Sequence, residues 1–291
     1  MVGLLWLLMA CKDEPVVDDP PAETDETDPP APVDTFPDPQ PDPGPPPAPA
    51  TRADRAAVES LRGTTVMHAV VGQWAASNPW MFAEAWDQWQ PDLRATVAAS
   101  VDGCGVLAPA AAQTGAQRDL GRGTLTWEGG TAEVPVKNCN DGEGDCTGRV
   151  WRVDFRTIVA LATPGGIYGL SAVEGGFVAF DVPELFQLPP EPFLITDAVA
   201  RPDGGLDLSV GGLAGGELGL IVHGSQPEPQ LWCELGASGS ASLSPAALAA
   251  IADNGDWRIQ VVRTERYVAP VGEATVVVTT EAWDEAWIDR P

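Results

Sequence analysis

Four tryptophans lie close together near the start of the folded region. Trp74, Trp80, Trp86 and Trp89 fall within sixteen residues. The apolar face of an indole ring can stack on a sugar ring, so an exposed group of this kind would suit a glycan ligand. Trp86 and Trp89 share a helical spacing with Phe82, which favours burial in a core. Trp80 lies off that stripe and is therefore the candidate for ligand binding.

A second concentration of polar groups lies between two cysteines. Asp141, Glu143 and Asp145 stand between Cys139 and Cys146, in a run rich in glycine and asparagine. Carboxylate and amide oxygens are the ligands that calcium prefers. The spacing departs from that of an EF-hand loop, which favours an acidic turn closed by a disulfide. The three acids remain a weak calcium candidate.

Other patterns that carry chemistry are absent or incomplete. The chain has two histidines, His68 and His223, too few for a zinc site without other ligands. The serine in Gly236-Ala237-Ser238-Gly239-Ser240 lacks the glycine spacing of a nucleophile elbow. The glycines at 211–216 do not have the spacing of a dinucleotide-binding loop. We therefore nominate no catalytic residue, no metal site and no cofactor.

The amino terminus has features of an export signal. An uncharged apolar run from Met1 to Ala10 ends at Cys11 and is followed by Lys12. It is far shorter than the ~20 residues that a membrane-spanning helix needs, so a removable signal is the better interpretation. Leu8-Met9-Ala10-Cys11 resembles the lipobox of bacterial lipoproteins.

The resemblance implies cleavage before Cys11 and a diacylglycerol on its sulfur. Two or more acyl chains hold a protein stably at a bilayer, so the membrane would be contacted through this lipid. Lipoproteins retained in the inner membrane carry Asp directly after the lipidated cysteine, whereas this chain carries Lys12. The resemblance therefore implies export and favours an outer-membrane location.

The residues after Cys11 have the composition of a tether. Residues 12–50 hold fourteen of the 29 prolines, and residues 11–50 hold eleven acids and one lysine. Proline removes backbone donors, and the acids repel one another, so this segment cannot bury a core. We expect a disordered, extended, hydrated linker.

The net charge excludes one class of partner. The whole chain carries a formal charge of −26, and residues 51–291 contribute 31 acids against 15 bases. Affinity for nucleic acid comes largely from Lys and Arg that neutralise phosphates. Nucleic acid is therefore not an expected ligand.

Four cysteines remain once Cys11 is set aside, and an exported chain would oxidise them. We expect two disulfides. Cys139 with Cys146 is favoured because turn residues separate them, which leaves Cys104 with Cys233. A bridge between Cys104 and Cys139 stays possible on the sequence alone.

The N-terminal part of the folded region has helical spacing. Asp54 to Leu61 carries apolar residues on one side, and the apolar residues of 67–74 recur three and four apart. Asn78 and Pro79 have the types of a helix start, which predicts a further helix through Trp89. Beyond about residue 94 the pattern alternates, most clearly from Trp151 to Leu161, and predicts antiparallel strands.

Residues 188–291 predict a second set of short strands. The ranges are 193–200, 206–210, 218–222, 231–235, 257–264 and 274–280, with a short helix at 244–251 that Ser244 caps. Their number and spacing suggest an immunoglobulin-like sandwich. The expected fold is thus mainly β, with antiparallel sheets and an N-terminal helical segment. The expected parts are a signal peptide (1–10), the lipidated cysteine and tether (11–50), a helical and antiparallel β domain (51–187) and a sandwich-like domain (188–291).

These observations predict a cell-envelope lipoprotein with a binding or scaffolding role, whose partner is an envelope protein or a glycan. The alternative is an envelope hydrolase that acts on glycan or peptide through carboxylates that the sequence does not identify. A catalytic role is the less favoured of the two.

Overall fold

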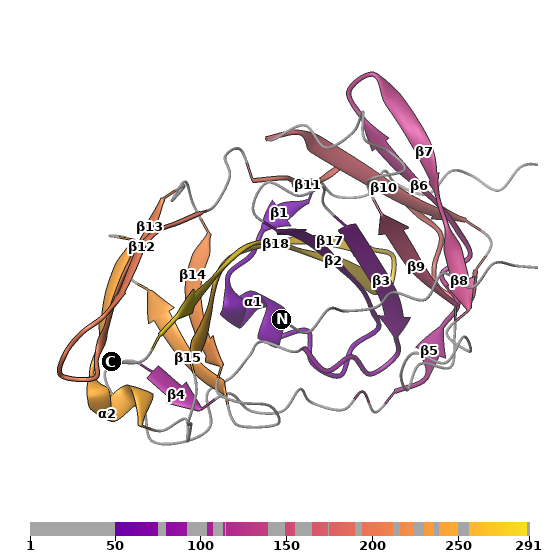
Figure 1. Cartoon of the computed structure of the whole chain (residues 1–291). Helices are drawn as coiled ribbons and strands as arrows, with labels where there is room; N and C mark the ends of the chain where they lie inside the picture. The colour runs from indigo at the N-terminus through magenta and orange to yellow at the C-terminus, as the bar shows by residue number, and fades with distance from the viewer. Residues whose placement is uncertain are drawn as a thin grey trace, which may run out of the picture. The chain divides into compact units, whose positions relative to one another are not determined.

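Strands make up most of the folded region in the computed structural model (Figure 1). The structure describes residues 50–74, 80–91, 104–106, 113, 115–138, 149–154, 165–173, 175–189, 194–211, 216–223, 230–235, 239–249 and 256–289. Within these ranges the strands form three sheets, together with two short helices, α1 (Arg55–Glu59) and α2 (Pro245–Leu248). The predicted mainly β fold is confirmed.

The largest sheet contains eleven of the described strands. Its main path runs in the order β4 (Cys104–Val106), β15 (Gln230–Leu235), β14 (Glu217–His223), β17 (Trp257–Val271), β18 (Ala274–Ile288), β2 (Val66–Trp74), β3 (Trp80–Trp86), β9 (Arg149–Asp154) and β8 (Val136–Asn138). β1 (Thr51–Arg52) adds to β17, and β5 (Gln117–Arg118) adds to β3. The long hairpin of β17 and β18 curves through the middle of Figure 1.

Two smaller sheets accompany it. One has the order β11 (Phe180–Gln187), β10 (Ile167–Val173), β6 (Arg122–Trp127) and β7 (Gly130–Val134), and the other has the order β12 (Leu194–Ala200), β13 (Leu206–Gly211) and β16 (Ser240–Leu243). Gly129 closes the β6–β7 hairpin with a φ of 89°, and Gly204 closes the β12–β13 hairpin with a φ of 85°. Glycine adopts these angles without the steric cost that other residues incur.

Two cores lie on the same face of the largest sheet. The first joins side chains of β2, β3, β17 and β18 to those of β6, β10 and β11. The second joins side chains of β14, β15, β17 and β18 to those of β13, β16 and α2. Each smaller sheet therefore shares a core with a different part of the largest one.

Polar side chains separate these two cores along β17. Arg263 and Glu265 are buried on the face that carries both cores. The Tyr267 hydroxyl donates to Glu265 Oε2 at 2.7 Å, and Arg52 forms an ion pair with the same oxygen at 3.2 Å. Burial, together with the neighbouring Glu265, raises the pKa of Tyr267 to about 12. The hydroxyl therefore stays protonated and continues to donate throughout the physiological range.

The prediction of helices after α1, in residues 66–74 and 80–86, is wrong. Residues 66–74 form strand β2, and residues 80–86 form strand β3. Met67, Ala69 and Val71 point into the first core, while Val66 packs on the opposite face beside α1. Because both faces of β2 are covered, its apolar residues do not alternate cleanly with polar ones, and their spacing imitates a helix.

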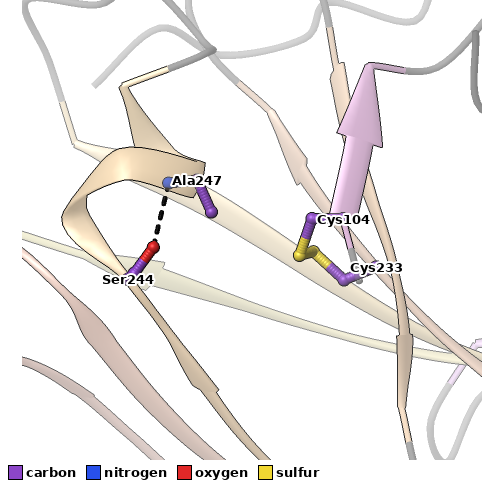
Figure 2. Close-up of a disulfide and its surroundings, with 4 residues drawn as sticks. All are labelled: Cys104, Cys233, Ser244 and Ala247. Atoms are coloured by element: carbon purple, nitrogen blue, oxygen red, sulfur yellow. Dashed lines mark hydrogen bonds between the residues drawn. A yellow bond between two sulfur atoms is a disulfide. The ribbon is translucent and has the colours of Figure 1, made fainter. Parts of the chain in front are cut away.

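The predicted strands of the C-terminal part are confirmed. β12 to β15 lie within a residue or two of their expected ends, and β17 and β18 continue beyond theirs. Helix α2 begins where predicted, with Ser244 Oγ accepting from Ala247 N at 3.1 Å (Figure 2). One pairing differs from expectation, since β18 and β2 run parallel and make the sheet mixed.

That parallel pair also crosses the boundary expected between residues 187 and 188. Val277 of the C-terminal segment is the register partner of His68 in the N-terminal segment. Strands from both sides of the boundary thus belong to one sheet. Residues 45–291 form one unit.

The disulfide between Cys104 and Cys233 is present, and it joins β4 to β15 (Figure 2). The two residues are direct register partners, their Cα atoms lie 4.1 Å apart, and both belong to the second core. The competing bridge between Cys104 and Cys139 is therefore wrong. Cys139 and Cys146 lie outside the described residues, as do Cys11 and the tether through residue 49.

Candidate ligand-binding site

The face of the largest sheet opposite the two cores carries a cavity of ≈ 460 Å³. Strands β2, β3, β14, β15, β17 and β18 form its floor and walls, and α1 closes one side. Figure 1 shows α1 lying against the curve that these strands make. Five aromatic side chains line the cavity, namely Trp80, Phe82, Trp89, Trp232 and Trp283.

Two of these tryptophans lie flat on the sheet because glycines stand beneath them. A Cβ atom added to Gly72 would come within 2.4 Å of the Trp80 indole, and one added to Gly219 would come within 1.8 Å of the Trp232 indole. Gly72 is the register partner of Trp80 across β2 and β3. Each glycine thus lets an indole from the neighbouring strand cover backbone and present a ring face as part of the wall.

The two indoles differ in exposure. Trp80 is 42% exposed, one of the few large apolar side chains that the described protein leaves in solvent. Trp232 is buried and packs with Ile221, Val262 and Trp283 in an apolar cluster on this face. Trp232 therefore forms the inner wall, and Trp80 forms the accessible one.

Charged side chains in the lining occur in equal numbers of each sign. The lining contains Arg55, Arg266, Glu217 and Glu281. Arg266 is 9% exposed and forms an ion pair with Glu217 across a distance of 2.9 Å. A buried guanidinium is tolerated only when it is paired in this way. The cavity is consequently close to neutral, with polar groups held between aromatic walls.

The histidine of the lining is fixed by neighbours on two sides. His68 Nε2 lies 3.0 Å from Thr279 Oγ1, within hydrogen-bonding distance. Its ring centroid lies 5.1 Å from that of Trp89. These contacts orient the imidazole at the cavity floor.

One further acid lies on this face outside the lining. Glu84 of β3 is the register partner of His68. Burial raises the pKa of Glu84. Its carboxyl group does not line the cavity, so it is not positioned to act on a ligand bound there.

The candidate residues from the sequence divide into three groups. Trp80 and His68 both line the cavity. His223 ends β14, where its Nε2 lies 2.7 Å from Gln260 Oε1, away from the lining. The weak calcium candidates Asp141, Glu143 and Asp145 lie outside the described residues.

Sequence reasoning missed most of the lining, because it comes from strands far apart in the chain. Trp232 and Arg266 belong to β15 and β17, and Glu281 and Trp283 belong to β18. A signal existed in β18, where Thr279, Glu281 and Trp283 occupy alternate positions of the strand and therefore share a face.

None of the helices in the described ranges is long and apolar enough to cross a bilayer. Among the same residues, no group of three or more His, Cys, Asp and Glu side chains is arranged to hold a metal ion.

The chain matches no protein-family model and no curated protein.

Proposed function

We propose that this protein is a cell-envelope lipoprotein whose folded part binds a glycan in the aromatic cavity. The observation that carries the proposal is the pairing of Trp80, lying exposed over Gly72, with the inner wall formed by Trp232 and Trp283. Ligand sites are typically apolar concavities with a few convergent polar groups, which describes this cavity.

A sugar ring fits the chemistry of the lining. Its C–H face is apolar and its rim carries hydroxyl groups, so it can bury against an indole while donating to carboxylates and accepting from guanidinium groups. Glu217 and Arg266 supply one group of each kind at the wall. The near balance of charge in the lining favours an uncharged ligand over an anion or a cation.

The alternative is a hydrolase that acts on the same class of ligand. Such an enzyme needs a carboxyl group that can give up a proton at the scissile bond. The lining holds two carboxyl groups, Glu217 and Glu281, and Glu217 is held in an ion pair with Arg266. An acid and a partner carboxylate would both have to come from this pair, because Glu84, whose pKa burial raises, lies outside the lining. These arrangements favour binding without catalysis.

The location of the protein is the second part of the proposal. The lipid on Cys11 holds the chain at the outer membrane, and the acidic tether of residues 11–50 keeps the folded part away from the bilayer. The lipobox resemblance and the proline content support this arrangement. An immunoglobulin-like sandwich for residues 188–291 remains part of the proposal, supported by the core that the three-stranded sheet shares with β14, β15 and β17.

Replacing Trp80 by alanine is expected to weaken glycan binding by about tenfold. Burial of an apolar side-chain face contributes roughly 1.5 kcal/mol, which corresponds to that factor. Binding of soluble N-acetylglucosamine oligomers to the wild-type and W80A proteins, measured by titration calorimetry, provides the measurement. Mass spectrometry of the same mixtures is expected to recover oligomers of unchanged length.

Two variants control this experiment. Trp80→Phe retains an aromatic face and should keep most of the affinity, while Val199→Ala removes an exposed apolar side chain from β12, away from the cavity, and should keep all of it. Equal affinity of wild type and W80A would contradict glycan binding in this cavity. Shortened oligomers would favour the hydrolase instead.

The anchor predicts that a palmitate analogue supplied to cells labels the wild-type chain and leaves Cys11→Ala unlabelled. A thioether-linked diacylglycerol requires the Cys11 sulfur, so the variant also stays with its signal segment uncleaved. Gel fluorescence of the captured analogue reports the label, and mass spectrometry reports the mature N-terminus. Equal labelling of the two chains would remove this part of the proposal.

A further inference from the structure

Strand β18 contains a short tandem repeat. The sequence Glu-Ala-Trp occurs at 281–283 and again at 285–287, with Asp284 between the two copies. Residues at alternate positions of a strand point to the same face. Both glutamates and both tryptophans therefore lie on the face that carries the cavity, while the alanines and Asp284 point toward the three-stranded sheet, where Asp284 accepts from Ile195 N.

The first copy belongs to the cavity, since Glu281 and Trp283 both line it. The second copy lies further along the same strand. Four residues of an antiparallel strand span about 13 Å, so Trp287 stands about that far from Trp283 on one continuous surface. The pair of side chains that lines the cavity is thus repeated on the same face of β18, beyond the cavity.

The second copy forms an exposed aromatic platform whose indole contacts two neighbouring side chains. Trp287 is 67% exposed, the highest value among the large apolar side chains in the described ranges. Its indole Nε1 donates to Glu285 Oε1 at 2.9 Å, and the Arg258 guanidinium lies 6.0 Å from its ring centroid. An exposed indole held by two neighbours has little side-chain freedom left to lose when a ligand covers it.

The carboxylate beneath the platform is itself held in place. Arg258 Nη2 donates to Glu285 Oε2 at 2.7 Å, and Gln260 Nε2 donates to the same oxygen at 3.3 Å. Burial alone would raise the pKa of Glu285, but these hydrogen bonds lower it below the ordinary value. Glu285 therefore stays ionised and accepting, and its charge is balanced by Arg258.

We propose that the ligand is a glycan chain of several sugar units, with Trp287, Glu285 and Arg258 forming a second subsite beside the cavity. This inference rests on the proposed function and extends it from one sugar-binding cavity to a glycan chain that occupies two subsites. Two copies of one Glu-Ala-Trp unit on one face match a ligand that repeats along its length. A lone small molecule would leave the second platform unused.

The charge of the protein further restricts the class of glycan that it can bind. Each subsite is balanced, by Arg266 with Glu217 in the cavity and by Arg258 with Glu285 at the platform. Residues 51–291 as a whole carry an excess of sixteen acids over bases. A polyanionic chain would be repelled, so the expected ligand is an uncharged or weakly charged polysaccharide.

A ladder of N-acetylglucosamine oligomers, from the dimer to the hexamer, tests the inference with the full chain. Wild-type affinity is expected to rise with oligomer length as the second platform is reached. Trp287→Ala should leave affinity for the dimer unchanged and lower affinity for the hexamer by about tenfold. Trp287→Phe should restore most of that loss, and Val199→Ala should show none.

The two proposals fail in different ways. If Trp80→Ala weakens every oligomer and Trp287→Ala weakens none, the cavity binds glycan and the second subsite is overturned. If neither substitution changes binding at any length, glycan binding itself is overturned. Circular dichroism of each variant shows whether its fold is retained, and Trp287 is exposed enough for its loss to leave the core intact.

Discussion

Replacing Cys104 and Cys233 together by alanine is expected to lower the free energy of unfolding by about 2–5 kcal/mol. The disulfide joins residues separated by 129 positions, so its loss frees a very long loop in the unfolded chain. The chain-entropy model gives nearly 5 kcal/mol for a loop on the order of 100 residues or more. Urea unfolding, followed by circular dichroism, gives the free energies to compare.

The second predicted bridge provides a matched control. Cys139 and Cys146 are only seven positions apart, and the same model gives roughly half as much stabilisation for so short a loop. Cys139→Ala with Cys146→Ala should therefore cost clearly less than the Cys104 and Cys233 pair. An equal loss in both double variants would show that loop entropy does not explain the stabilisation.

A local effect accompanies the global one. β4 is three residues long and lies at the end of the sheet path, where it pairs with β15 alone among the described strands. Without the covalent bond, three residues of pairing are too few to hold an edge strand, because ordering each residue costs about 1–2 kcal/mol of backbone entropy. Amide hydrogen exchange at 104–106 should accelerate more than exchange in β17 and β18.

The strands of the C-terminal part could be predicted because their sequence carries clear local signals. Pro202 to Gly205 forms a turn in which Gly204 adopts a φ of 85°, and the flanking residues alternate between the second core and solvent. Ser244 followed by Pro245 is a helix start that needs no tertiary partner. These features depend on residues close together in sequence.

The prediction for the N-terminal strands β2 and β3 was wrong because their sequence lacks such local signals. β2 lies between two covered faces, with Met67 in the first core and Val66 packed near Trp89 and Val58. A sequence distinguishes the helix period from the strand period only when one face of the element is polar. The apolar residues of β2 therefore fit either period. The parallel pairing with β18 that decides the matter brings together residues about two hundred positions apart.

The residues that line the cavity could likewise be predicted only in part. Trp80 could be singled out because it departs from the spacing of its neighbours, but its partners could not be identified. Trp232 and Trp283 join it only through the order β15, β14, β17, β18, β2 and β3, which long-range pairing determines.

Replacing Gly219 by alanine is expected to cost about 1–3 kcal/mol of stability and to abolish the inner wall of the cavity. The new Cβ would lie 1.8 Å from Cη2 and 2.3 Å from Cζ2 of the Trp232 indole, so the ring must leave its position. Overpacking in a filled region typically costs this much. Because Trp232 packs on Val262 and Trp283, its displacement also disturbs the wall that receives the ligand.

Gly211→Ala is the matched control, since this glycine also lies in a strand and, among the described residues, its added Cβ would meet Thr196 Cγ2 alone, at 3.2 Å. Urea unfolding and oligomer titration of both variants give the two readouts. A double variant separates the clash from other effects of the substitution: with Trp232→Ala the ring is gone, so Gly219→Ala should then cost almost nothing further. Equal cost of Gly219→Ala with and without the Trp232 ring would show that the indole does not depend on the glycine beneath it.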